Sequence, residues 1–146
     1  MLLSKISSAH IKVMAELHAG CFDEPWTEHA FYQLINLPTT VGWINEMGFV
    51  LCSHVLDEME IMTICTHPDY RRQGLGQSLL SQIEKYAKLA NVCNIFLEVR
   101  DDNTPAQNLY LKNGYIKTGL RKGYYKTKSG PVDAVCMMKE ISKNVP

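Results

Sequence analysis

The chain has 146 residues, of which 46% are hydrophobic, so it is long enough to bury one core and too short for two ordinary domains. Lys plus Arg and Asp plus Glu balance at 15 each, which leaves no net field to draw the protein to nucleic acid or to an anionic membrane. We therefore expect a single domain over residues 1–146 that does not bind nucleic acid directly.

The first third of the chain predicts a short strand and two helices. Residues 2–6 have the composition of a strand, and Ser8 can cap a helix because apolar residues recur behind it at helical spacing. Thr27 offers a second N-cap, with Glu28 in the first turn, where the helix dipole favours a negative charge. Pro38 ends this second, shorter helix.

The middle of the chain changes from a strand pattern to a helical one. Residues 41–66 favour three antiparallel strands, with turns at residues 46–48 and 57–58. From residue 75 onward, apolar side chains fall on one helical face for about four turns. This periodicity predicts the strongest helix of the chain, over residues 75–90.

The last third predicts a buried strand, one more helix and a hairpin. Residues 93–99 are a short apolar run of strand length. A helix opens at residues 104–105, with a proline at its first position, and Gly114 closes it. Residues 115–126 and 132–140 then form the two strands of a final hairpin.

The most informative segment is residues 71–76, Arg-Arg-Gln-Gly-Leu-Gly, because it lies between a strand and the strongest helix. Gly74 and Gly76 let the backbone curl and aim N–H groups inward, and the helix dipole behind them favours an anion such as a pyrophosphate. Dinucleotide and Walker motifs are excluded, since Leu79 replaces a required small residue and no Gly-Lys-Ser/Thr is present. On these six residues alone, a glycine-rich helix start with exposed arginines is an equal alternative.

The spacing Arg71-x-x-Gly74-x-Gly76 resembles the signature of the GNAT acetyltransferase superfamily, and residues 67–70 are also similar to that family. The resemblance implies an α/β fold with a single mixed, mostly antiparallel central sheet flanked by helices. It also implies acetyl-CoA as the cosubstrate, for chemistry that requires no metal. The positions that match the family's cofactor contacts are Ile64, Cys65, Thr66, Arg72, Gln73, Gly74, Leu75, Gly76, Gln77 and Asn103.

Several downstream segments are similar to the RimI branch of the superfamily, whose members acetylate the N-terminal amine of a ribosomal protein. The likeness is carried by residues 97–100, 108–110, 113–115, 124–125 and 133–134. It implies two catalytic residues, Glu98 and, twelve positions later, Tyr110. It also implies that Trp26, Tyr124 and Tyr125 border an acceptor protein with a free N-terminal Ala or Ser, although packing is an alternative role for these aromatic residues.

The reaction needs a base and an acid. An α-amine has a reference pKa of about 8, so at neutral pH much of it is protonated and cannot attack a thioester. Strand alternation places Glu98 on the same face as Phe96, in partly apolar surroundings. We expect Glu98 to take the amine proton, directly or through a water, and Tyr110 to protonate the departing thiolate. By family resemblance, a backbone N–H near Cys65 or Thr66 would bind the thioester oxygen.

Other features favour packing and solvation over chemistry. The five cysteines form no Cys-x-x-Cys pair, and we expect them to be small buried hydrophobes in a reducing compartment. Cys65 and His67 are assigned no catalytic role. The first residues lack the apolar core of a signal peptide, and no run approaches the roughly 18 to 20 apolar residues of a spanning helix, so we expect a cytoplasmic protein with no membrane partner.

Two alternative functions remain open at the level of sequence. The first is a GNAT acetyltransferase for lysine or for a small-molecule amine, which would use the same fold and cosubstrate. The second is a non-catalytic acyl-CoA-binding or interaction module, because a fold does not guarantee a function. The presence of both Glu98 and Tyr110 disfavours the second alternative.

Overall fold

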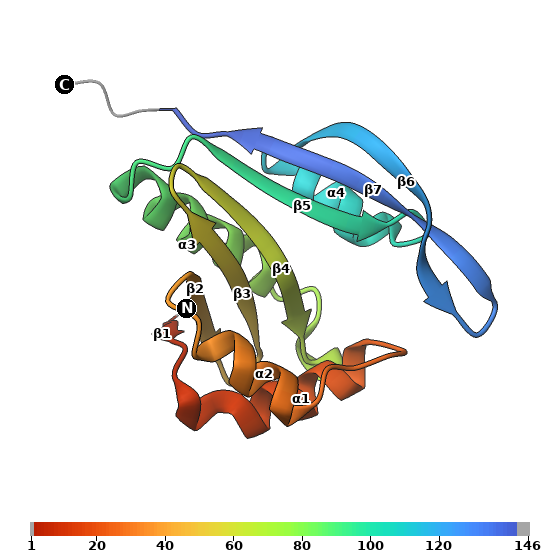
Figure 1. Cartoon of the computed structure of the whole chain (residues 1–146), viewed down its shortest axis with the longest axis horizontal. Coiled ribbons are helices and arrows are strands. Elements are labelled where there is room, and N and C mark those ends of the chain that lie inside the picture. Colours follow the sequence, from red (N-terminus) through yellow and green to blue (C-terminus); the bar gives the residue numbers. More distant parts are fainter. Residues whose placement is uncertain (1, 143–146) are drawn as a thin grey trace.

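The computed structural model describes residues 2–142, which form a seven-stranded sheet with helices on both faces (Figure 1). The strand order is β1-β2-β3-β4-β5-β7-β6, and every neighbouring pair is antiparallel except β4 and β5. The strands are β1 (Ser4–Lys5), β2 (Thr40–Asn45), β3 (Gly48–Val55), β4 (Glu58–Thr66), β5 (Asn94–Arg100), β6 (Ile116–Thr127) and β7 (Gly130–Glu140). The helices are α1 (Ile11–Cys21), α2 (Glu28–Ile35), α3 (Leu75–Leu89) and α4 (Thr104–Lys112). The expected mixed, mostly antiparallel sheet is confirmed.

The helices begin close to where the sequence predicts. Thr27 Oγ1 accepts the backbone N–H three residues on at 3.1 Å and caps α2, and Asn103 Oδ1 does the same for α4 at 3.2 Å. The first predicted cap is wrong by one residue. Ser7 is the N-cap, because its backbone is extended, whereas Ser8 already lies in a 3-10 turn, Ser8–His10, that leads into α1.

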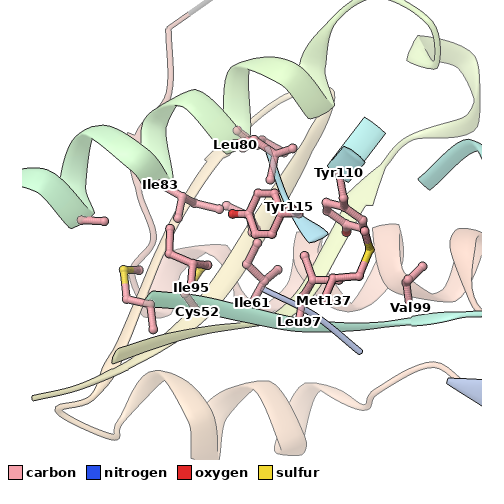
Figure 2. Packing of buried hydrophobic residues seen from close by; sticks show 14 of the residues in the cluster. Cys52, Ile61, Leu80, Ile83, Ile95, Leu97, Val99, Tyr110, Tyr115 and Met137 are labelled. Carbon is pink, nitrogen blue, oxygen red and sulfur yellow. The ribbon is translucent and has the colours of Figure 1, made fainter. Parts of the chain in front are cut away.

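Among the described residues, buried hydrophobic side chains form two clusters, one on each face of the sheet. The larger cluster includes Ile83 of α3 and Leu97 of β5 and fills the space between the sheet, α3 and α4 (Figure 2). The smaller cluster joins α1 and α2 to the opposite face and includes Met14, Phe31 and Phe49, all fully buried. Each such side chain contributes roughly 1.5–3 kcal/mol to stability. The helices are therefore held firmly against both faces.

The parallel pair β4 and β5 separates partway along its length. Its last paired positions are Ile61 and Leu97, although both strands continue beyond them, and Figure 1 shows the strands diverging. Met62 forms a bulge in β4, because Ile61 and Thr63 pair with consecutive residues of β3. A bulge bends a strand and interrupts regular pairing. The carboxyl ends of β4 and β5 are consequently apart, and the candidate site lies there.

Within residues 2–142, no helix combines the length and the apolar character that crossing a membrane requires.

Candidate active site

A cavity of about 490 Å³ lies where β4 and β5 separate. Its walls come from α1 and the loop after it, the ends of both strands, α4, and the end of β6. The residues predicted for the site that line this cavity are Trp26, Ile64, Glu98, Asn103, Tyr110, Tyr124 and Tyr125. The structure therefore brings together both residues expected for catalysis and all three expected beside the acceptor.

Glu98 reaches the cavity because of the alternation of β5. Its neighbours Leu97 and Val99 are buried in the larger cluster, so Glu98 lies on the opposite face of the sheet. The side chain is 20% exposed, and its Oε1 forms an ion pair with Arg121 Nε at 3.1 Å. The sequence predicted partly apolar surroundings for Glu98 and did not predict this charged neighbour. Arg121 comes from β6, and β6 reaches Glu98 only across β7, which no local sequence pattern reveals.

Tyr110 enters the cavity from α4, on the other face of the sheet. Its ring is 4% exposed and packs edge-on against Tyr115, with ring centroids 5.7 Å apart (Figure 2). Burial raises the pKa of Tyr110 far above its ordinary value, and nearby Cys52 and Tyr125 act in the same direction. Its hydroxyl therefore keeps its proton throughout the neutral range and can act as a donor.

Sequence reasoning missed His18, which is only 2% exposed and lines the cavity. Its ring stacks between Phe22 and Trp26, with centroid distances of 4.1 and 4.9 Å. The backbone N–H of Trp26 donates to His18 Nδ1 at 3.0 Å. The ring proton of the neutral histidine is therefore on Nε2, which donates to Thr63 Oγ1 at 3.2 Å. Burial lowers the pKa of His18 to about 4, so the ring is neutral at neutral pH. A neutral histidine thus fixes the backbone of Trp26 in the cavity wall.

Tyr124 and Tyr125 reach the opposite wall through an irregularity in the hairpin. Pairing of β6 with β7 is interrupted just before Tyr125, and within this interruption Gly123 has a φ of 62°. The Gly123 N–H donates to Asp133 Oδ1 at 2.8 Å, which anchors the bulge and re-aims the side chains beside it. Burial, with the charge of Glu98 next in weight, raises the pKa of Tyr125 to about 12. Tyr125 consequently borders the cavity as a neutral ring with a polar hydroxyl, and Tyr124 lies beside it.

The loop before α3 has the geometry of an anion cradle. Gly74 caps α3 with a φ of 82°, and Arg72 also adopts a left-handed backbone, with a φ of 64°. The first helical hydrogen bond joins Ser78 N to Gly74 O at 3.0 Å, so the N–H groups of residues 75–77 precede the helical ladder. Nothing lies within 4 Å of a Cβ built on Gly74, so its φ and not a lack of space favours glycine here. Left-handed residues followed by unpaired N–H groups at a helix N-terminus fit a pyrophosphate.

Three positions predicted to contact the cofactor also have structural roles. A Cβ on Gly76 would lie 2.7 Å from Leu109 Cδ2, so this glycine permits α3 to pack on α4. Gln77 Nε2 donates to Asn113 Oδ1 at 2.7 Å, and Asn103 caps α4. Gly76 and Gln77 would therefore contact a cofactor through their backbone N–H groups. The glycine motif alone does not distinguish phosphate binding from helix packing.

The cysteines are less uniform than the sequence suggested. All five are free, but only Cys52 and Cys65 are buried, so the expectation of five buried hydrophobes is wrong for Cys21, Cys93 and Cys136. These three are at a helix end, in a loop and on the partly covered face of β7, where packing is incomplete. Within residues 2–142, no group of three or more His, Cys, Asp or Glu side chains is placed to hold a metal ion.

Comparison with known proteins places this geometry in a family. The sequence model of the acetyltransferase (GNAT) family matches residues 11–115, which is most of the chain. The chain belongs to the GNAT acetyltransferase family. It is therefore an N-acetyltransferase whose acyl donor is acetyl-CoA, as the resemblance of residues 71–76 implied, and the cradle at residues 72–77 fits the pyrophosphate of that donor.

Individual relatives agree with the family assignment. The Escherichia coli [ribosomal protein bS18]-alanine N-acetyltransferase is 34% identical over 123 residues, covering 81% of this chain and 82% of that protein. The Salmonella typhimurium enzyme of the same name is 30% identical over 145 residues, covering 96% and 97%. The crystal structure of the ribosomal-protein-S18-alanine N-acetyltransferase from Escherichia coli superimposes with a TM-score of 0.90 at 27% identity, covering 99% of this chain and 98% of that one. The predicted likeness to the RimI branch is thereby confirmed.

Proposed function

We propose that this GNAT acetyltransferase works in the cytoplasm as a single domain and acetylates the N-terminal α-amine of a protein, namely the alanine of ribosomal protein bS18. The names of the Escherichia coli and Salmonella typhimurium relatives support this acceptor. The observation that carries the proposal is the cavity between β4 and β5, in which Glu98 and Tyr110 meet from opposite faces of the sheet. One face supplies a base and the other an acid.

The donor is held mainly by main-chain atoms. The cradle at residues 72–77 binds the pyrophosphate, and the acyl arm enters the gap where pairing ends after Ile61 and Leu97. Beyond that point, β4 presents residues 64–66 toward the gap without a partner strand in β5. Backbone groups there supply hydrogen bonds for the arm and for the thioester oxygen.

Glu98 acts as the base. Its carboxylate takes a proton from the α-ammonium of the acceptor, directly or through a water, and the neutral amine then attacks the acetyl carbonyl. The C–N bond forms and the C–S bond breaks without a covalent enzyme intermediate, and the second proton that the attacking nitrogen loses passes to water. Arg121 orients the carboxylate through its 3.1 Å contact, and because Arg121 is 58% exposed it can move aside as the cationic amine arrives.

Tyr110 acts as the acid that protonates the departing thiolate. Burial keeps the phenol protonated until that step. The same burial makes an ionised sulfur in the cavity unfavourable, so the proton acceptor is also more basic there than in water. Transfer between the two groups therefore remains feasible although the pKa of Tyr110 is raised.

Aromatic side chains shape the acceptor side. Trp26 from the loop after α1 and Tyr124 and Tyr125 from β6 face the same cavity as Glu98. A second cavity of about 310 Å³ shares Leu97 and Glu98 and is lined by residues of β3, β4, β5, β7 and β6. An extended peptide with its amine at Glu98 would have room to leave along this path, whereas an isolated small amine would not use it.

The first test separates acceptors by mass spectrometry. The purified protein is incubated with acetyl-CoA and two peptides, one with a free N-terminal Ala and one with a blocked N-terminus and an internal Lys. We expect acetylation of the free peptide alone, and a loss of about 10²- to 10⁴-fold in kcat/KM for Glu98→Gln. Glu140→Gln is the matched control, because Glu140 is an exposed carboxylate at the far end of the same strand pair.

Other outcomes decide between the alternatives. Acetylation of the blocked peptide would replace the N-terminal assignment by lysine acetylation, and turnover of a free polyamine alone would indicate a small-amine enzyme. Binding of CoA in a calorimeter with no turnover of any acceptor would support a non-catalytic module. Equal activity of Glu98→Gln and wild type would overturn the role of Glu98 as the base.

A further inference from the structure

Cys21 and Cys65 place two thiols in direct contact beside the acetyl-transfer cavity. Their Sγ atoms are 2.8 Å apart, although 44 positions separate the residues in the sequence. Cys65 is on β4 and 2% exposed, whereas Cys21 is the last residue of α1 and partly exposed. The length of a disulfide bond is about 2.05 Å, so the two sulfurs need to approach by only roughly 0.8 Å to be joined.

The two thiols have different surroundings. Arg71 Nη2 lies 3.8 Å from Cys21 Sγ, and Cys21 Sγ also lies 3.3 Å from the carbonyl oxygen of Thr66. A partly exposed sulfur beside a guanidinium is the setting in which cysteines react with oxidants. Cys65 is shielded from solvent, and burial raises its pKa. An oxidant therefore meets Cys21 first, and Cys65 reacts second. This arrangement separates an attacking cysteine from a resolving one.

We propose that Cys21 and Cys65 are a redox modification site, at which a peroxide forms a reversible disulfide that slows acetyl transfer. Cys21 Sγ attacks one peroxide oxygen, the O–O bond breaks, and a sulfenic acid and one water result. Cys65 Sγ then attacks Cys21 Sγ, so that the S–S bond forms and the S–O bond breaks. The hydroxide leaves with the proton of Cys65 as a second water. Two thiols lose two electrons in total, and the peroxide is reduced to two waters.

The bond would act on the site from two sides. Cys21 directly precedes the loop that carries Phe22 and Trp26 into the cavity wall, and Cys65 lies within residues 64–66 of the open edge of β4. Misplacement of reacting groups by about 1 Å can cost up to about 10²-fold in rate, so we expect kcat/KM to fall by at least about tenfold. The same bond closes a long loop in the unfolded chain, and Tm should rise by an amount on the order of 10 °C. A fall in activity with a rise in stability distinguishes this bond from oxidative damage.

The experiment uses the full chain, titrated with hydrogen peroxide and then treated with dithiothreitol. Intact mass, alkylation with iodoacetamide and peptide mapping follow the thiols, while Tm and acetylation of the free N-terminal peptide follow the consequences. We expect a loss of two hydrogen atoms, a linked peptide pair containing Cys21 and Cys65, and full reversal by dithiothreitol. Cys21→Ser should form no link and keep its activity and Tm under peroxide. Cys93→Ser, which removes another partly exposed thiol, should behave as wild type.

The outcomes are separable. If Cys21 and Cys65 both remain alkylable after Cys93 is oxidised, or if Cys21 reaches sulfinic acid without a link, the modification site is overturned. A fully linked protein with undiminished activity would overturn the regulatory part. The activity measurement rests on the proposed acceptor, whereas the mapping and Tm do not. If the peptide is not acetylated even before oxidation, the proposed function fails, and the thiol pair is still decided by mapping.

Discussion

The proposed donor side, at residues 72–77 before α3, and the proposed acceptor side, in the wall of the cavity, are built by different means. On the donor side, one short segment, residues 72–77, provides main-chain N–H groups at the start of α3. On the acceptor side, side chains come from α1, from the loop after it, from β5 and from β6, so that His18 and Tyr125 meet from distant parts of the chain. Backbone recognition needs a local conformation, whereas a wall of side chains needs the whole tertiary fold.

This difference predicts different responses to substitution. The donor side should be sensitive to changes in backbone conformation and tolerant of changes in side-chain chemistry. The acceptor side should show the reverse, because its shape depends on the neutral state of His18, the ion pair of Glu98 with Arg121, and stacked rings. Substitutions at the junction of the two sides, where Glu98 and Tyr110 meet, should have the largest effects.

Tyr110→Phe tests that junction. Loss of the hydroxyl removes the proton donor but keeps the buried ring, so kcat should fall by about 10²-fold while the Kd for acetyl-CoA changes little. Tyr115→Phe is the matched control, since Tyr115 is equally buried and packs against Tyr110 but does not line the cavity. Steady-state kinetics and calorimetric CoA binding would measure the pair. Equal losses in both variants would mean that Tyr110 serves packing and not proton transfer.

Gly74→Ala tests the donor side alone. An L residue at a φ of 82° costs about 1–2 kcal/mol, so we expect the KM for acetyl-CoA to rise by about tenfold with little change in the acceptor KM. Gly20→Ala makes the same change in α1, where nothing lies within 4 Å of the added Cβ and the helix should gain about 0.5–1 kcal/mol. A rise in the acceptor KM for Gly74→Ala would show that the two sides are not independent.

The same contrast explains what the sequence could predict. The donor side could be predicted from the sequence because its strand, glycine spacing and helix are contiguous. Most helix and strand boundaries could also be predicted, because caps and turns are local. The packing role of Gly76 was not predicted, because its close neighbour Leu109 belongs to another helix. His18 was missed, because its neutral state depends on Phe22, Trp26 and Thr63 closing around it. Nothing in the spacing of β6 placed Arg121 at Glu98.

His18 allows the acceptor wall to be tested one nitrogen at a time. His18→Asn can keep an acceptor for the Trp26 N–H, whereas His18→Gln can keep only a donor for Thr63. A neutral hydrogen bond contributes about 1 kcal/mol, so the acceptor KM should rise about fivefold further in His18→Gln than in His18→Asn. The KM for acetyl-CoA should be the same in both. The reverse order would show that the contact with Thr63, and not the one with Trp26, positions the wall.

The last expected effect is on stability and not on activity, and it is a pH dependence that belongs to the acceptor side. Burial lowers the pKa of His18 from 6.5 to about 4, so the unfolded chain binds a proton there that the folded protein excludes. Stability is therefore complete above pH 6.5 and falls as the pH drops toward 4, by up to about 3 kcal/mol from this group. Urea unfolding across this pH window measures the slope of the unfolding free energy against pH. In His18→Gln this slope should be smaller than in wild type by up to the equivalent of one proton. His29→Gln, at an exposed position on α2, is the control. Parallel slopes in wild type and His18→Gln would mean that His18 takes up its proton without leaving the wall, and the acceptor side would then be more tolerant of charge than the stacked rings indicate.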